Sequence, residues 1–126
     1  MIAYLDTHVA VWLHDGLVER LSTSAKQRIE SSDLLISPMV LLELQYLFDR
    51  KRLAVEPMPI YTYLQATFGV GLCSYAFPAI VVEAIQCGWT NDPFDRIVVA
   101  HAKANNGAAL ITADTLIRRY YSGAVW

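Results

Sequence analysis

The chain has 126 residues, of which 55% are hydrophobic and 17% charged, and its formal net charge is −2. This length predicts one domain, residues 1–126, with a sizeable core. No apolar run reaches the ~18 residues of a membrane span, and no basic and then long apolar segment opens the chain, so we expect no membrane and a cytoplasmic location. A weakly acidic total is not typical of nucleic-acid binders, yet compact basic clusters at 50–52 and 118–119 leave a phosphate-bearing substrate possible.

Strand-like and helix-like segments alternate along the chain. Short β-prone apolar runs predict strands over residues 2–5, 34–36, 72–75, 109–112 and 124–126. Apolar periodicity and capping residues predict helices over residues 9–14, 23–30, 60–67, 78–86, 93–105 and 115–118. A further helix is predicted to begin at residue 38 and to end in the basic cluster at 50–52. Strands separated by helices favour a mostly parallel sheet covered on both faces, which is a three-layer α/β fold.

Residues with strong capping preferences set the expected helix ends. Ser37 and Asp92 are expected N-caps, Ser22-Thr23-Ser24 offers N-cap residues for the second helix, and Pro38 and Pro93 suit the first helical position. The expected breaks after helices are at Gly16, Gly69, Gly71, Gly88 and Gly107.

Single acidic residues follow the strands or border the helices near them. Asp6 ends the first strand and Asp114 follows the fourth, and the carboxyl ends of parallel strands are where sites form in open α/β sheets. Glu43 borders the apolar stripe of its helix, where an unpaired carboxylate costs free energy. Asp95 lies one turn into its helix. Asp6 could equally cap the next helix, Glu43 could be paired in a salt bridge, and the N-cap role already accounts for Asp92.

Acids gathered at one sheet edge repel one another unless a cation neutralises them. Oxygen ligands favour Mg²⁺ or Mn²⁺, and such ions suit phosphodiester hydrolysis by activated water that attacks phosphorus in line. His8, His14 and His101 have no metal-ligand spacing, so we expect structural or peripheral roles for them. Cys73 and Cys87 also lack such a spacing and are expected to be buried and reduced.

Four motifs, in order over nearly the whole chain, resemble the PIN domain family and, more narrowly, its VapC-type toxins. They are Tyr4-Leu5-Asp6-Thr7-His8, Ser37-Pro38 with Leu42-Glu43-Leu44, Asp92-Pro93-Phe94-Asp95-Arg96 with Ala100-His101-Ala102, and Leu110-Ile111-Thr112-Ala113-Asp114.

The resemblance implies a Rossmann-like α/β/α domain with about five strands and a Mg²⁺- or Mn²⁺-dependent endoribonuclease. The catalytic metal ligands that it implies are Asp6, Glu43, Asp95 and Asp114. The polar residues that it places around them are Thr7, Asp92, Arg96 and Thr112. It also implies a homodimer and inhibition by a small antitoxin protein. The candidates for holding the RNA backbone are Arg50, Lys51, Arg52, Arg118 and Arg119.

Two other functions are weighed against this one. A phosphatase-like domain needs Asp-x-Asp after the first strand, where the sequence has Asp6-Thr7-His8, and a receiver domain needs a lysine that is missing near residues 112–114. A catalytically silent PIN-like binding or scaffold module usually lacks some of the acids, and all four are present.

Overall fold

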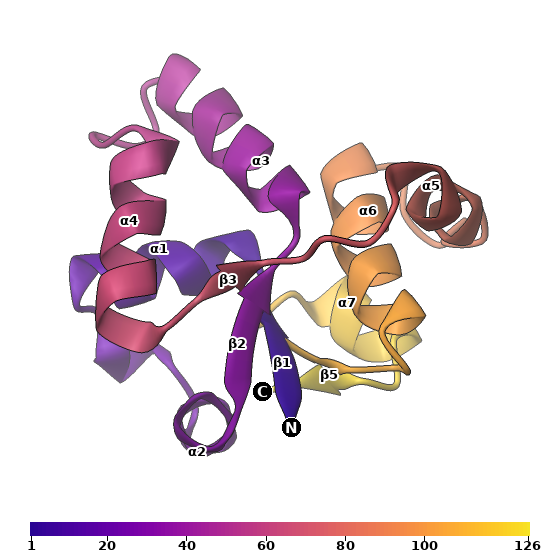
Figure 1. Ribbon diagram of the computed structural model, residues 1–126, viewed down its shortest axis with the longest axis horizontal. Helices are drawn as coiled ribbons and strands as arrows, with labels where there is room; N and C mark the ends of the chain where they lie inside the picture. The colour runs from indigo at the N-terminus through magenta and orange to yellow at the C-terminus, as the bar shows by residue number, and fades with distance from the viewer.

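The first strand of the chain is the centre of the sheet in the computed structural model, which describes residues 1–126 (Figure 1). The sheet order is β3-β2-β1-β4-β5, and every neighbouring pair is parallel. The strands are β1 (Ile2–Leu5), β2 (Asp33–Ile36), β3 (Gly71–Leu72), β4 (Ala109–Ile111) and β5 (Ala124–Val125). The prediction of a parallel sheet of about five strands is confirmed.

Helices lie on both sides of this sheet and complete the three-layer α/β/α arrangement (Figure 1). They are α1 (Thr7–Asp15), α2 (Thr23–Ser31), α3 (Pro38–Asp49), α4 (Pro57–Phe68), α5 (Phe77–Ile85), α6 (Pro93–Ala104) and α7 (Thr115–Tyr120). A short 3-10 helix, Val18–Arg20, which the sequence did not predict, joins α1 to α2. No helix combines the length and the apolar character needed to cross a membrane.

Capping residues end the helices largely where their chemistry predicts. The side chains of Ser22, Ser37 and Asp92 accept backbone N–H bonds at the starts of α2, α3 and α6. Gly16 and Gly69 follow α1 and α4 in the left-handed conformation, with φ of 72° and 70°, which glycine adopts without strain.

Several predicted boundaries were wrong by a few residues. Helix α1 begins at residue 7 rather than 9, because the carboxylate of Asp6 caps it. Helix α4 begins at Pro57 rather than 60. Gly71 belongs to β3 instead of closing α4. Helix α6 ends at Ala104 with Asn105 as its C-cap, which lies two residues before Gly107.

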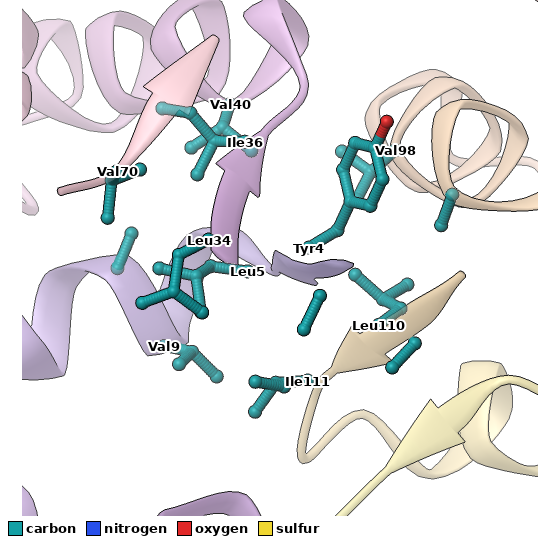
Figure 2. Packing of buried hydrophobic residues seen from close by; sticks show 14 of the residues in the cluster. Tyr4, Leu5, Val9, Leu34, Ile36, Val40, Val70, Val98, Leu110 and Ile111 are labelled. Carbon is teal, nitrogen blue, oxygen red and sulfur yellow. The ribbon is translucent and has the colours of Figure 1, made fainter. Parts of the chain in front are cut away.

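The core lies on both faces of β1, whose residues Ala3, Tyr4 and Leu5 are fully buried. Successive residues of a strand point to opposite faces. Figure 2 shows Tyr4 directed toward Val98 of α6, and Leu5 on the other side near Val9 of α1. Strand β1 is therefore sealed by helices above and below, as its uncharged sequence predicts.

The connections that follow the neighbouring strands β1 and β4 lead to opposite halves of the sheet. The chain passes from β1 to β2 on one side, and from β4 to β5 on the other. Between β1 and β4 the crossovers therefore diverge, and a crevice opens at the carboxyl ends of these strands. Asp6 lies at this point, where its backbone N–H donates to the carbonyl of Ile111 over 3.1 Å.

Candidate functional site

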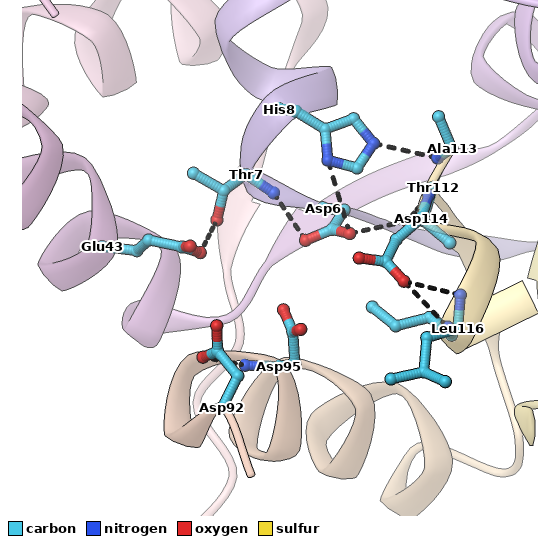
Figure 3. A network of polar contacts seen from close by, with 11 residues as sticks. Asp6, Thr7, His8, Glu43, Asp92, Asp95, Thr112, Ala113, Asp114 and Leu116 are labelled. Carbon is cyan, nitrogen blue, oxygen red and sulfur yellow. Dashed lines mark hydrogen bonds and ion pairs between the residues drawn. The ribbon is translucent and has the colours of Figure 1, made fainter. Parts of the chain in front are cut away.

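An acidic pocket of about 320 Å³ opens at the carboxyl ends of β1 and β4. Five carboxylates line it, from two helices, α3 and α6, and from the ends of two strands, and neither lysine nor arginine lines it. Figure 3 shows these carboxylates facing a common space. The lining residues are Asp6, Thr7, His8, Val11, Trp12, Glu43, Leu47, Leu53, Asp92, Asp95 and Asp114.

Asp6 is the most constrained acid of this pocket. It is only 3% exposed, and its Oδ1 accepts the N–H of Thr7 over 2.8 Å. Its Oδ2 accepts the hydroxyl of Thr112 over 2.6 Å. Thr112 does not line the pocket itself, yet its hydroxyl oxygen also accepts the N–H of Asp114 over 3.0 Å. One hydroxyl thus connects two of the acids that the sequence assigned to the site (Figure 3).

Three of the acids are helix N-caps as well as pocket residues. Asp6, Asp92 and Asp114 cap α1, α6 and α7, and each accepts backbone N–H groups through Oδ1. The positive ends of three helix dipoles therefore meet at the pocket and stabilise negative charge there. Asp6 and Asp92 therefore are N-caps, which was the alternative to a site role for each, and capping places both carboxylates at the pocket.

Glu43 enters the pocket from the middle of α3. The hydroxyl of Thr7 donates a hydrogen bond to its carboxylate, so Thr7 contacts one of the predicted acids as expected. Burial raises the pKa of Glu43, the Thr7 hydrogen bond opposes that rise, and the charges of Asp6 and Asp92 add to it. Burial and the neighbouring acids therefore favour the protonated form of Glu43, and the Thr7 hydrogen bond favours its ionised form.

Asp95 carries the largest resolved pKa shift of the five acids. It lies in the first turn of α6 and faces the others across the pocket (Figure 3). Burial, and then the charges of Asp92, Asp6, Asp114 and Glu43 in that order, together raise the pKa of Asp95 to about 8. Without a cation, this carboxyl group is largely protonated at neutral pH.

His8 lines the pocket although the sequence indicated a peripheral role. Its Nε2 accepts the N–H of Ala113 over 2.9 Å, so the ring proton is on Nδ1. Nδ1 lies 3.6 Å from Oδ2 of Asp6. The signal that could have found His8 is its place two residues after Asp6, because a helix that begins directly after its N-cap turns this side chain toward the sheet edge.

An aromatic wall, also missed from the sequence, lies beside His8. Trp12, one turn along α1, lines the pocket, and its ring centroid is 5.0 Å from that of His8. The ring centroid of Trp126 lies 5.9 Å from that of Trp12 and 6.5 Å from that of His8. The three rings therefore form one cluster, of which His8 and Trp12 line the pocket.

Arg96 is the predicted site residue that the structure does not bring to the acids. Its Nε donates to the carbonyl of Thr90 over 2.7 Å, and its side chain lines a separate pocket between α5 and α6. Arg96 therefore stabilises the loop before α6 instead of balancing the acid cluster. His14 and His101 also lie outside the acidic pocket.

The donor set fits a hard divalent cation, because every acidic group of the pocket is a carboxylate and no protein cation lines it. In the present side-chain positions, no three acidic, histidine or cysteine side chains are close enough to hold one metal ion. A shared ion would thus require the carboxylates of Glu43, Asp95 and Asp114 to turn further toward Asp6.

Comparison with known proteins gives a family match and a fold match. The model of the PIN domain family matches residues 3–123. A VapBC2 structure from Rickettsia felis, bound to a promoter DNA fragment, contains a chain of 20% identity and TM-score 0.62, covering 98% of this chain and 96% of that one. DNA-bound VapBC from Salmonella typhimurium gives 15% identity and a TM-score of 0.57, covering 98% and 95%. VapBC-1 from nontypeable Haemophilus influenzae gives 19% identity and a TM-score of 0.55, covering 94% of this chain and 91% of that one. No curated protein matches the sequence. At these identities the structures show a shared fold.

Proposed function

Because the chain belongs to the PIN domain family, we propose that its acidic pocket is the active site of a divalent-metal-dependent endoribonuclease. The observation that carries this proposal is the convergence of Asp6, Glu43, Asp95 and Asp114 on one pocket at the divergence of the sheet crossovers. We further propose that the whole chain acts as a single domain.

The residues proposed to hold Mg²⁺ or Mn²⁺ are Asp6, Glu43, Asp95 and Asp114. When bound, such an ion lowers the pKa of water and stabilises negative charge on the leaving oxygen of a phosphodiester. Thr112 and Thr7 keep the carboxylates of Asp6 and Glu43 in place through their hydroxyl groups.

The protein groups also prepare the pocket for the phosphate. The dipoles of α1, α6 and α7 help to keep carboxylates ionised next to a cation. His8 holds the loop before α7 against α1 through Ala113, so that Asp114 stays at the pocket. No side chain of the pocket is a nucleophile of the serine or cysteine type, and we propose hydrolysis without a covalent enzyme intermediate.

We propose that this nuclease is the toxin of a toxin–antitoxin pair, acts on RNA in the cytoplasm, forms a homodimer and is inhibited by a small antitoxin. The fold shared with chains of three VapBC structures supports an antitoxin partner. Large apolar side chains exposed on α3 and α5, among them Leu42, Val82 and Ile85, are compatible with protein partners on two surfaces.

The test is cleavage of a mixed cellular RNA pool by the purified protein with Mg²⁺, with Mn²⁺ or with EDTA. Discrete fragments that need metal and disappear in Asp6→Asn are expected. Asp33→Asn is the matched control, because Asp33 lies at the opposite end of the neighbouring strand β2 and is exposed. If the folded wild type binds metal but cuts no RNA, a catalytically silent binding module replaces this proposal. Cutting that survives both EDTA and Asp6→Asn would remove the site assignment.

A further inference from the structure

An aromatic ladder with a cation at its end bridges α3 and α6 beside the acidic pocket. The ring centroids of Tyr46 and Phe94 are 5.5 Å apart, with the planes inclined by 48°. The guanidinium of Arg50 lies 5.3 Å from the centre of the Tyr46 ring. Tyr46 is 45% exposed and its hydroxyl has no hydrogen-bond partner in the protein, so the ring contributes little to the core.

The ladder is next to the acids in sequence and in space. Tyr46 follows Glu43 by one helical turn on α3, and residues three apart share one helix face. Phe94 directly precedes Asp95 in the first turn of α6. The contact between Tyr46 and Phe94 therefore connects the two helices that supply Glu43 and Asp95.

The ladder also continues into a basic turn. Arg50, Lys51 and Arg52 are all exposed, and none of them forms an ion pair. Lys51 and Arg52 line a groove of about 660 Å³ together with Leu53. Leu53 lines the acidic pocket as well, so the groove and the pocket share a wall. The groove with Lys51 and Arg52, which Asp49 also lines, therefore adjoins the pocket with its five carboxylates, and Arg50 connects the basic turn to the Tyr46 ring.

We infer that this ladder is a subsite that stacks one unpaired nucleobase of the RNA next to the cleaved phosphate. The inference rests on the proposed nuclease function and names the form of its substrate. Bases stack on aromatic rings and on guanidinium planes, and basic residues beside such rings neutralise the adjoining phosphates. Arg50 ends the ladder in solvent, so a base extends it by stacking on the guanidinium or by replacing it on the Tyr46 ring.

The expected specificity is for single-stranded segments. A base inside a duplex has both faces covered by its neighbours and cannot stack on Tyr46 without leaving the helix. Stacking also depends little on base identity, because every base has a π-face. The ladder therefore selects unpaired RNA and contributes little to sequence preference.

The experiment measures binding of a short single-stranded RNA that contains one 2-aminopurine, whose fluorescence falls when it stacks. All proteins carry Asp6→Asn to prevent cleavage. Tyr46→Leu keeps an apolar contact with Phe94 but removes the ring, and we expect about tenfold weaker binding and loss of the quenching. Tyr46→Phe should restore both. Tyr63→Leu is the matched control, since Tyr63 is 42% exposed on α4 and does not line the pocket.

Two further measurements separate this inference from the proposed function. In otherwise wild-type protein, Tyr46→Leu should raise KM for single-stranded RNA about tenfold with little change in kcat. Unchanged binding and KM in Tyr46→Leu, or an equal loss for single-stranded and duplex RNA, would overturn the subsite. Quenching that depends on Tyr46 in a protein that cuts no RNA would support the subsite and reject the nuclease.

Discussion

The hydroxyl of Thr112 donates a 2.6 Å hydrogen bond to Oδ2 of Asp6 across the carboxyl ends of β4 and β1. Both residues are buried, and the same hydroxyl oxygen accepts the N–H of Asp114. The Asp6 carboxylate and the Asp114 amide thus both depend on the Thr112 side chain for a hydrogen bond. Its removal leaves a carboxylate oxygen and an amide with no partner, which is costly in a buried place.

Thr112→Val is therefore expected to lower the free energy of unfolding by about 1–3 kcal/mol, although the two side chains have nearly the same shape. The metal-dependent RNA cleavage rate should fall as well, because Asp6 and Asp114 lose their common anchor. Urea unfolding and a cleavage assay measure the two effects. Thr112→Ser keeps the hydroxyl and should retain most of both properties; an equal loss in serine and valine would show that the methyl group matters instead.

The pKa of about 8 for Asp95 predicts an unusual pH dependence of stability. An unfolded aspartate has a pKa near 3.9, so between about pH 4 and pH 8 the folded state binds a proton that the unfolded state lacks. The contribution of this group to the free energy of unfolding is present below pH 4 and is lost as the pH rises toward 8. In EDTA, Asp95→Asn should melt at least ~4 °C above wild type at pH 8, with a smaller difference at pH 5.

Binding of metal should reverse the order of the melting temperatures of wild type and Asp95→Asn. Mg²⁺ stabilises ionised carboxylates, so it should raise the melting temperature of the wild type more at pH 8 than at pH 6, and that of Asp95→Asn less. Asp33→Asn, at the far end of β2, should respond like the wild type. Equal Mg²⁺ responses of wild type and Asp95→Asn would exclude Asp95 from the metal-binding group.

His8 should be needed to keep the loop before α7 in place. In His8→Phe the N–H of Ala113 loses its acceptor, which is 2.9 Å away, while the ring can still pack on Trp12. We expect faster hydrogen exchange of the Ala113 amide, by about tenfold, and weaker RNA cleavage. His14→Phe is the control, because His14 pairs with its neighbour Asp15, packs against Tyr63 and lies outside the pocket. Unchanged exchange at Ala113 would contradict the role of His8.

The buried pair of Ser37 and His101 predicts acid sensitivity. Ser37 Oγ lies 2.7 Å from Nδ1 of His101 and also caps α3, so the pair joins the starts of α3 and the end of α6. Burial lowers the pKa of His101, and a backbone contact with Ile97 opposes that change. Below about pH 6.5 the unfolded state binds a proton that the folded state does not, so this group lowers the free energy of unfolding as the pH falls.

His101→Gln removes that titration and keeps a polar partner for Ser37. Relative to wild type, the variant should gain stability as the pH falls from 7 to 5, by at most ~1.4 kcal/mol per pH unit. Thermal melts of both proteins at both pH values measure this difference. Asp95 is present in both proteins, so its contribution cancels when the two are compared. A difference that does not change with pH would show that His101 is not the acid-sensitive group.

The local features of the fold could be predicted because they depend on few neighbouring residues. A serine or aspartate with a proline after it is a strong helix start, and Ser37-Pro38 and Asp92-Pro93 behave as expected. The apolar run before Asp6 likewise identified the central strand. The four predicted acids line one pocket because parallel strands and the helices after them meet at one edge.

The remaining features depend on contacts between distant parts of the chain. The predicted strand 72–75 stops at Leu72, because its neighbour β2 ends at Ile36. The N–H of Cys73 still donates to the carbonyl of Ile36, and no backbone hydrogen bond joins residues 74 and 75 to β2. The distance of Arg96 from the pocket follows from its hydrogen bond to the Thr90 carbonyl, which no helical spacing reveals. The ladder of Tyr46 and Phe94 likewise depends on how α3 crosses α6.

The position of β1 between β2 and β4 also decides when the pocket can exist during synthesis. Thr112, which holds Oδ2 of Asp6, is made 106 residues after it. Until β4 has been translated, β1 lacks its neighbour on one side and Asp114 has no place beside Asp6. A nascent chain therefore lacks the assembled acidic pocket until β4 has been translated and has paired with β1.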